Sequence, residues 1–295
     1  MGDRWMVNLQ VKIAELMPDW LYDTLYGCKI LPSYLQWRLH PVGGSRARAY
    51  FQPLKNALYG YRCVVIGNGP SLKMMDLNPL KEEYTIGLNR IYLMFESLGL
   101  TTDWLVAVNR FVLQQFSSEM EDPGCVTILN WRYRNRAEAP GPGTVFLHPA
   151  PYKKSMDGSI LKGYYPHIGS VTNVALEMAF FLGFSEVILI GVDHNYQHSG
   201  TGSQVVESAG PDPDHFSADY FGKGTLWQLP DYQLMEHGFR ENRRLFESDG
   251  RQIVDGTVAG KLDVFPKVDF YQHLQKSTYM KKGRKGPVSG SQLSP

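Results

Sequence analysis

The sequence has few cysteines: Cys28, Cys63 and Cys125 are the only three. An odd, widely spaced set is typical neither of a disulfide framework nor of a zinc cluster. Cys63 lies inside an apolar run, so we interpret it as a core residue. Sparse cysteines without pairing favour a reducing compartment, and we predict a cytoplasmic protein.

An excess of charge and a long apolar run are also missing. The 30 Lys and Arg residues nearly balance the 29 Asp and Glu residues, for a net charge of +1. No global field would draw the chain to nucleic acid, which disfavours non-specific polyanion binding. No apolar run reaches the ~18 residues of a membrane-spanning helix, and the first residues do not have the layout of a signal peptide.

What is present suits a large globular protein: 295 residues, of which 43% are hydrophobic. We predict a helical N-terminal extension (residues 1–58), a catalytic domain (59–278) and a basic, disordered tail (279–295). The extension combines apolar, aromatic and basic residues. Two alternatives stay open for it: helices packed on the main domain, or an interfacial surface in peripheral contact with the inner face of a membrane.

From residue 61 onward, short apolar strands alternate with helical stretches, which favours βαβ units in a doubly wound, Rossmann-like, mostly parallel sheet. The predicted strands are Arg62–Ile66, Tyr84–Asn89, Trp104–Val108, Val126–Trp131, Thr144–Leu147, Glu186–Asp193 and Ile253–Asp255. The predicted helices are Leu72–Leu77, Ile91–Leu98, Phe111–Met120, Ser170–Leu182 and Asp231–Ser248. The strand Glu186–Asp193 is apolar on both faces, so we expect it to be central.

The first predicted strand runs into a glycine-rich turn, Gly67–Ser71 (Gly-Asn-Gly-Pro-Ser). Gly67 and Gly69 allow unusual backbone angles and close approach of a ligand. We expect Ser71 to cap a following helix, whose positive end would suit a phosphate or another anion. The stretch lacks the third glycine of G-x-G-x-x-G and the Gly-Lys-Ser/Thr of a P-loop. A structural turn and a nucleotide site both remain open.

Three predicted strands end at or just before an asparagine: Asn68, Asn89 and Asn109. Ligands in an open parallel sheet bind at the carboxyl ends of the strands. An amide side chain can donate and accept hydrogen bonds at once, which suits a sugar, a nucleobase or a ribose hydroxyl. The alternative for each is a turn-forming or capping role.

The segment 194–229 is long, irregular and rich in Gly, Ser, Asp, Pro and His. Such a loop in a compact domain is usually functional or disordered, and we predict a lid. Asp193, just before it, could hold a metal, orient a base, receive a proton or bond loop amides. His194 and His198 lie on no helix that would align them on zinc, so we predict no metal site and interpret a lid histidine as a general base.

These residues together resemble a known group. The run Val65–Lys73, the three asparagines and Gly191–Asp193 are similar to the bacterial sialyltransferases of glycosyltransferase family 42. They are also similar to the central domain of motility accessory factors and to the DUF115 family, which includes an archaeal 6-hydroxymethylpterin diphosphokinase. Asp214–Gly224 and Gly260–Pro266 are most similar to DUF115 members. The resemblance covers roughly residues 60–270.

The resemblance implies site residues. Asn68, Asn89 and Asn109 would surround the CMP part of a CMP-sugar donor, with Ser170 and Thr172 beside them. Tyr196 and Tyr220 would contact the phosphate. Where the sialyltransferase lid carries Tyr-Ile-Gly-His, with the histidine as base, this chain has Tyr-Phe-Gly-Lys ending at Lys223. A lysine suits a phosphate but is mostly protonated at neutral pH.

Three hypotheses follow. The first is a glycosyltransferase that moves a sugar, in particular an acidic one, from a CMP-type donor to a glycan or protein acceptor. It would act in surface polysaccharide or glycoprotein assembly and require no cofactor. Its base would be His215, then His194, then Asp193, while Lys223 and Tyr220 would stabilise the leaving phosphate.

The second hypothesis is a Mg²⁺-dependent diphosphokinase of the 6-hydroxymethylpterin type. It would use ATP, with Asp193 and Asp212 or Asp214 on the metal. The third is a nucleotide-binding protein without catalysis, consistent with the missing lid histidine.

Overall fold

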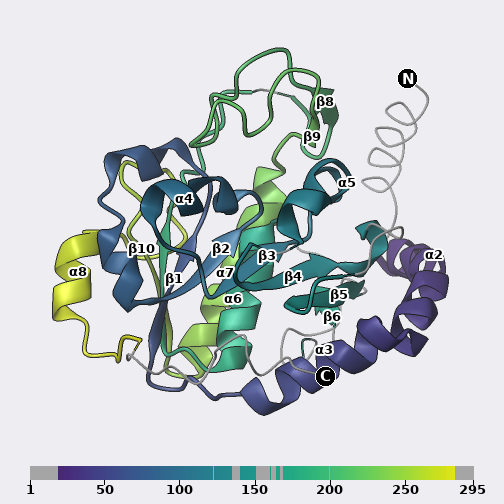
Figure 1. The fold of residues 1–295 in the computed structure, drawn as a ribbon, viewed down its shortest axis with the longest axis horizontal. Helices are drawn as coiled ribbons and strands as arrows, with labels where there is room; N and C mark the ends of the chain where they lie inside the picture. The colour runs from purple at the N-terminus through teal and green to yellow at the C-terminus, as the bar shows by residue number, and fades with distance from the viewer. Residues whose placement is uncertain are drawn as a thin grey trace.

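The computed structural model describes residues 19–121, 123–134, 140–150, 160, 164–166, 169–198 and 200–282. Its centre is an eight-stranded sheet with the order β10-β7-β1-β2-β3-β4-β5-β6, in which every neighbouring pair is parallel (Figure 1). The strands are β1 (Arg62–Ile66), β2 (Tyr84–Leu88), β3 (Trp104–Ala107), β4 (Val126–Asn130), β5 (Thr144–Ala150), β6 (Tyr164–Pro166), β7 (Glu186–Ile190) and β10 (Gln252–Asp255). The predicted α/β, doubly wound class is confirmed.

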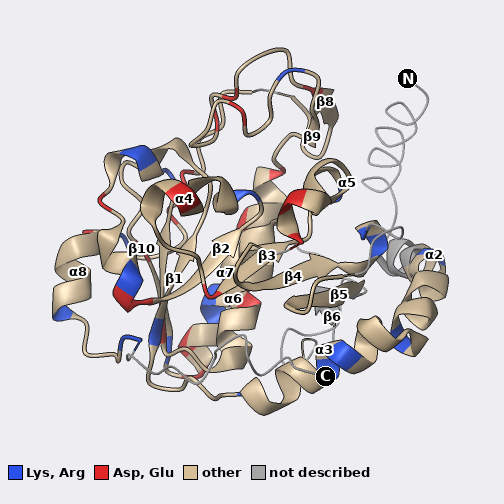
Figure 2. Ribbon diagram, viewed as in Figure 1, with Lys and Arg blue, Asp and Glu red and all other residues tan. Residues whose placement is uncertain are grey.

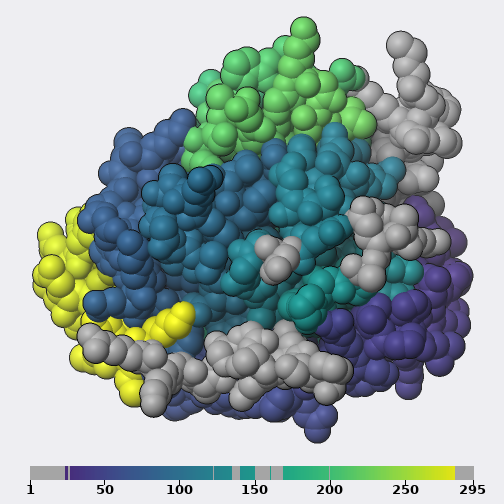
Figure 3. All heavy atoms as spheres, viewed as in Figure 1, coloured from purple at the N-terminus to yellow at the C-terminus, as the bar shows by residue number. Residues whose placement is uncertain are grey.

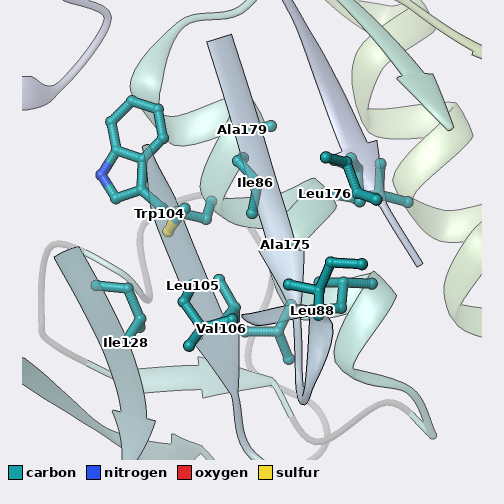
Figure 4. Packing of buried hydrophobic residues seen from close by; sticks show 14 of the residues in the cluster. Ile86, Leu88, Trp104, Leu105, Val106, Ile128, Ala175, Leu176 and Ala179 are labelled. Atoms are coloured by element: carbon teal, nitrogen blue, oxygen red, sulfur yellow. The ribbon is translucent and has the colours of Figure 1, made fainter. Parts of the chain in front are cut away.

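The central strands are buried on both faces, as their continuous apolar sequences predict. All five residues of β1, β2 and β7 are buried. Helix α6 (Val171–Leu182) packs against β1, β2 and β3. Its small residues Ala175 and Ala179 lie beside Ile86 and Leu88 of the sheet in Figure 4, so the helix approaches the strands closely. Helix α7 (Tyr232–Ser248) packs on α6.

The stretch predicted as the helix Leu72–Leu77 is instead the short 3-10 turn η3 (Pro70–Met74), so that prediction was wrong. The chain leaves helical angles at Met75, which is extended (φ −112°, ψ 141°), and another 3-10 turn, η4 (Asn78–Glu82), follows. The remaining elements divide into α-helices and short turns. They are η5 (Ile91–Met94), α4 (Phe95–Leu98), α5 (Arg110–Phe116), η6 (Ser117–Met120), η7 (Trp131–Tyr133) and α8 (Phe270–Lys276).

The described part of the N-terminal extension is helical, as predicted, and packs on the β5 side of the sheet. It comprises α2 (Asp19–Leu39), the irregular turn η1 (Pro41–Ser45), α3 (Arg46–Phe51) and η2 (Gln52–Leu54). The fully buried Trp37 donates its indole N–H to the carbonyl of Phe146 on β5 at 3.0 Å. Tyr50 accepts from the indole of Trp104 at 2.7 Å. Most of the predicted stripe Val7–Tyr26 lies outside the described residues.

The tail begins later than its predicted start at residue 279. Met280 pairs with the chain before β1: the Arg62 amide donates to the Met280 carbonyl at 2.9 Å, and the Met280 amide donates to Gly60 at 3.0 Å. Lys281 and Lys282 pair with Glu82 and Asp103. Residues 283–295 lie outside the described residues.

The lid segment (residues 194–229) is not wholly irregular, because it contains a small antiparallel pair, β8 (Val205–Glu207) and β9 (Leu226–Gln228). Figures 1 and 3 show it lying on the body of the domain at the end of the sheet near α5. Among the helices of the described residues, none is long and apolar enough to cross a bilayer.

Candidate functional site

The strand order places a switch point at β1, which has β7 on one side and β2 on the other. The chain moves outward from β1 through β2 to β6 and then returns to the other side with β7. Crevices at the carboxyl ends beside such a point are where open α/β sheets bind ligands. The glycine-rich turn after β1 and the Gly191–Asp193 segment after β7 both lie there.

The glycine-rich turn is tied directly to the end of β7. Gly67 and Gly69 donate their amides to the carbonyls of Ile190 and Gly191, each at 2.8 Å. A Cβ atom on Gly69 would lie 1.7 Å from Oδ2 of Asp193. Glycine is therefore required at this position because a carboxylate occupies the space above it.

The Asp193 carboxylate also accepts hydrogen bonds from Ser71, the last residue of the turn. Asp193 accepts from the Ser71 amide at 3.0 Å and from the Ser71 hydroxyl at 2.7 Å. Burial raises the pKa of Asp193, and these two bonds oppose the shift. The expectation that Ser71 caps a helix was wrong, since its side chain caps no helix and instead fixes Asp193. The protein's own Asp193 carboxylate therefore occupies the position at which this turn was expected to bind an anion.

Two asparagines on the β2 side carry acceptor atoms with no partner among the described residues. Asn68 donates its Nδ2 to the Leu88 carbonyl at 3.0 Å, and its Oδ1 is buried without a hydrogen bond. Asn89 has a φ of 47°, and its Oδ1 is likewise buried and unbonded. Buried polar atoms are nearly always bonded in native proteins. Two such oxygens after neighbouring strands therefore mark a place where a ligand can supply N–H or O–H donors.

Asn109 differs from these two because its side-chain oxygen is used by the protein. Oδ1 accepts from the amides of Phe111 and Val112 at 2.9 and 3.2 Å and caps helix α5. Asn130 behaves similarly at the end of β4, where its Oδ1 accepts from the Arg132 amide at 3.0 Å. Asn109 therefore caps a helix with its side-chain oxygen, whereas the side-chain oxygens of Asn68 and Asn89 have no partner among the described residues.

Replacement of Asn109 by alanine should lower the free energy of unfolding by about 1 kcal/mol, the usual cost of losing a cap. We expect nucleotide affinity to stay unchanged. Urea unfolding gives the first quantity and calorimetric titration the second. Asn109→Asp keeps an accepting oxygen and should preserve stability. A selective loss of affinity in the alanine variant would show instead that Asn109 contacts the ligand.

The lid is closed onto this edge through backbone hydrogen bonds. The Phe216 amide donates to the Asn68 carbonyl at 2.8 Å. On α5, the Gln115 side chain bonds both the amide and the carbonyl of Leu226, at 2.9 and 2.8 Å. The Tyr196 amide bonds the Tyr232 hydroxyl at 3.2 Å. The lid therefore rests on the ends of β1, α5 and α7 together.

Arg90, directly after Asn89, joins the sheet to the lid and was missed in the sequence. Its guanidinium donates to the carbonyls of Asp219 and Tyr220 and pairs with Glu119 at 3.0 Å. It also stacks on Phe116, 3.7 Å from the ring centroid. Burial lowers the pKa of Arg90, but hydrogen bonds and charges from Tyr92 and Glu119 outweigh it and raise the value overall.

His215 is a lid histidine held by two neighbouring side chains. Its Nδ1 lies 2.8 Å from Oδ2 of Asp212, and its ring stacks on Tyr220 with centroids 3.9 Å apart and planes 4° apart. Burial raises the pKa of Asp212, but bonds from His215 and two backbone amides outweigh it and hold the value below its usual range. Asp212 is therefore ionised at neutral pH and orients the imidazole through Nδ1.

The stacked pair of rings lies beside the two asparagines. His215 precedes Phe216, whose amide bonds Asn68, and the Tyr220 hydroxyl accepts from the Arg90 amide at 3.4 Å, next to Asn89. Tyr220 is fully buried, and burial raises its pKa. Its hydroxyl, predicted to contact a phosphate, is instead directed at backbone in this closed form.

The other predicted base, His194, is less accessible. It is buried, with a φ of 51°, and its Nε2 lies 3.2 Å from Oε1 of Glu236. Its ring packs edge-on against Tyr232 with centroids 4.8 Å apart. His198 pairs with Asp214 at 2.6 Å on the outer side of the lid. The His194 side chain is thus less exposed than that of His215, at 5% against 12%.

The remaining predicted residues differ in burial and in their partners. Ser170 caps α6, accepting from the Thr172 amide at 3.1 Å, and Thr172 is buried. Tyr196 lies at the start of the lid, and burial raises its pKa. Lys223 is exposed on the lid and is not brought to the other site residues; its phosphate role stays a prediction.

A Mg²⁺ ion suits the available carboxylates poorly. Asp193 is bonded to Ser71, Asp212 to His215 and Asp214 to His198. No group of three potential ligand side chains occurs among the described residues. Mg²⁺ usually takes one or two carboxylates together with substrate phosphates, and here each candidate would first have to leave its partner.

The comparisons with known proteins agree with this fold. The family model of 6-hydroxymethylpterin diphosphokinase MptE-like proteins matches residues 45–199, more than half of the chain. A solved structure of the MAf glycosyltransferase from Magnetospirillum magneticum AMB-1 is similar, with a TM-score of 0.50 and 14% identity. The match covers 82% of this chain and 40% of that one, so this chain spans less than half of that protein. No curated protein sequence matches.

Proposed function

The chain belongs to the 6-hydroxymethylpterin diphosphokinase MptE-like family, and we propose that within it this protein is a glycosyltransferase with a nucleotide-sugar donor. A CMP-linked acidic sugar is the favoured donor, and a glycan or protein is the acceptor. The observation that supports this most is the Asp212–His215 pair. A base held by a carboxylate beside two unbonded asparagine oxygens suits proton removal from a hydroxyl next to a bound nucleotide.

The proposed reaction is a single displacement. Nε2 of His215 takes the proton of the acceptor hydroxyl, and the acceptor oxygen forms a bond to the anomeric carbon of the donor sugar. The bond between that carbon and the phosphate oxygen breaks, and the nucleotide leaves with the electron pair. Asp212 stabilises the imidazolium that forms. Lys223 would approach the leaving phosphate only after a movement of the lid.

The donor's nucleotide would bind at the β1–β2 edge. The Oδ1 atoms of Asn68 and Asn89 accept hydrogen bonds, which suits the exocyclic amino group of cytosine or a ribose hydroxyl. The likeness to the glycosyltransferase structure supports only the fold at 14% identity. The family name makes a diphosphokinase the second candidate, which the commitment of Asp193, Asp212 and Asp214 to other partners disfavours.

Calorimetric titration with CMP, and with ATP plus Mg²⁺, separates the two. We expect CMP to bind. Binding of ATP with Mg²⁺ but not of CMP, with AMP formed in the presence of hydroxymethyl-dihydropterin, would overturn the glycosyltransferase proposal in favour of the diphosphokinase. Binding of neither ligand would refute the nucleotide site itself.

Asn89→Gly tests the site with little disturbance of the backbone, because glycine accepts the left-handed angles of this residue. Loss of one buried hydrogen bond to the ligand should weaken CMP binding by about 10- to 100-fold. Asn56→Gly is the matched control, since Asn56 also has a left-handed φ of 56° and its side chain contacts Arg251 instead. Equal affinities in the two variants would remove Asn89 from the site.

A further inference from the structure

Helix α2 presents an exposed apolar face. Leu25, Leu31, Leu35 and Leu39 are 49%, 51%, 47% and 82% exposed. At about 100° per residue, these leucines and the exposed Cys28 fall within roughly a third of the helix circumference, with Leu25 and Leu31 at its two borders. We call these five residues the outer face of α2. The opposite side of the helix contacts the body of the domain through buried side chains such as Trp37.

This clustering differs from ordinary surface hydrophobicity. Single exposed apolar residues are normal on proteins, whereas a contiguous row marks a contact surface. Ten large hydrophobic residues are exposed in the described part of the chain, and four of them are these leucines. The row therefore needs a partner that can accept apolar side chains.

After Asp19 and Asp23 in the first turns of α2, the charge along the extension is of one sign. Between residues 24 and 75 the sequence contains no Asp or Glu, although the whole chain is balanced at +1. The extension carries five basic residues there: Lys29, Arg38, Arg46, Arg48 and Lys55. On the parts of α2 and α3 that Figure 2 draws in colour, the ribbon is marked for basic and not for acidic residues. Within the described residues, Lys29, Arg38 and Arg48 form no ion pair.

We propose that the outer face of α2 is a docking surface for an anionic lipid bilayer. Leucines on one side of a helix can enter the boundary between headgroups and acyl chains, and neighbouring Lys and Arg side chains bind lipid phosphates. Nucleic acid would use the cations but leave four leucines without apolar contacts. A lipid surface uses both sets of side chains.

The contacts of α2 with β5 show toward which end of the sheet this helix begins. Ser33 contacts Nε2 of His148 at 2.9 Å in the carboxyl-terminal half of β5. Trp37, one turn later in α2, bonds Phe146, nearer the start of β5. The helix therefore begins toward the end of the sheet that carries Asn68 and Asn89. A bilayer docked on the helix would hold that end of the sheet beside lipid-attached molecules. Docking itself does not depend on the reaction proposed above.

Vesicle co-sedimentation of the full chain tests the proposal. We expect binding to vesicles of equal parts phosphatidylcholine and phosphatidylglycerol, and little binding to phosphatidylcholine alone. Leu31→Gln with Leu35→Gln should reduce binding by about tenfold or more. Lys29→Gln with Arg38→Gln should reduce it by at least about fivefold and lower its salt dependence. Met74→Gln with Leu93→Gln, which changes exposed apolar residues elsewhere, is the control.

A probe on Cys28 locates the contact directly. Cys63 is buried, so an environment-sensitive dye on a Cys125→Ser background reports from the outer face, and its emission should shift to the blue with anionic vesicles. Absence of binding, binding unaffected by the leucine variants, or an unshifted dye would overturn the proposal. So would a dimer that buries the dye without lipid, or tighter binding to RNA than to vesicles.

Discussion

Replacement of His215 by alanine is expected to lower the transfer rate by about 10²- to 10⁴-fold, the usual contribution of a positioned general base. The reason is the geometry of the imidazole. Its Nδ1 lies 2.8 Å from Oδ2 of Asp212, and its ring stacks on the ring of Tyr220. CMP affinity should change little, because the imidazole acts on the acceptor hydroxyl. Asp212→Asn keeps an accepting oxygen but removes the charge that stabilises imidazolium, and we expect a smaller fall, about tenfold or more.

Single-turnover kinetics with the wild type and each variant measure these effects, and calorimetry measures nucleotide binding. His198→Ala is the matched control, since His198 is a lid histidine that also pairs with an aspartate, 2.6 Å from Asp214, but is exposed. It should retain most of the activity. Near-normal turnover in His215→Ala would remove the base from the mechanism, and His194 would then be the next residue to replace.

Arg90→Ala should release the lid. The substitution leaves the carbonyls of Asp219 and Tyr220 without their donor, at about 1–3 kcal/mol each, and it removes the stacking on Phe116, worth about 1 kcal/mol. We expect the free energy of local lid opening to fall by several kcal/mol, and activity to fall with it. Hydrogen exchange of the Phe216 amide, which bonds Asn68 in the closed form, reports the opening.

Arg244→Ala is the control for this experiment, because Arg244 is largely exposed and pairs only along its own helix with Glu241. It should leave exchange in the lid unchanged. Arg90→Lys keeps the positive charge but not the forked donors, and we expect an intermediate rate of exchange. If Phe216 exchanges equally slowly in all three variants, the lid is held by other contacts.

The layout of the sheet was predictable because it depends on local pattern. Runs such as Glu186–Ile190 are apolar on both faces, and that pattern specifies a buried parallel strand wherever its partners lie. The hydrogen bonding of the glycine-rich turn was not predictable. Whether Ser71 caps a helix or binds Asp193 depends on a contact across 122 residues, and a 3-10 turn that ends at Met74 replaces the predicted helix.

Some features of the candidate site were also predictable from the sequence, and others were not. The sequence placed Asn68, Asn89 and Asn109 at one edge, yet it could not tell a capping oxygen from an unbonded one, because that depends on the amides nearby. Arg90 was missed since its partners lie on the lid, although a charged residue directly after a strand-end asparagine is a usable signal. The general base stays a prediction: His194, His198 and His215 each have a carboxylate partner, and those pairings depend on contacts that the sequence does not show.

The contacts around β1 also constrain the order in which the chain can fold. β2 follows β1 closely, but β7 and Met280 are synthesised much later, and contacts of high sequence separation form slowly. During synthesis the Gly67–Ser71 turn therefore emerges long before Asp193, the residue that fixes it. We expect the β1–β2 region to remain incompletely structured on the ribosome until β7 has left the exit tunnel. Nascent chains stalled before residue 193 should lack the nucleotide site.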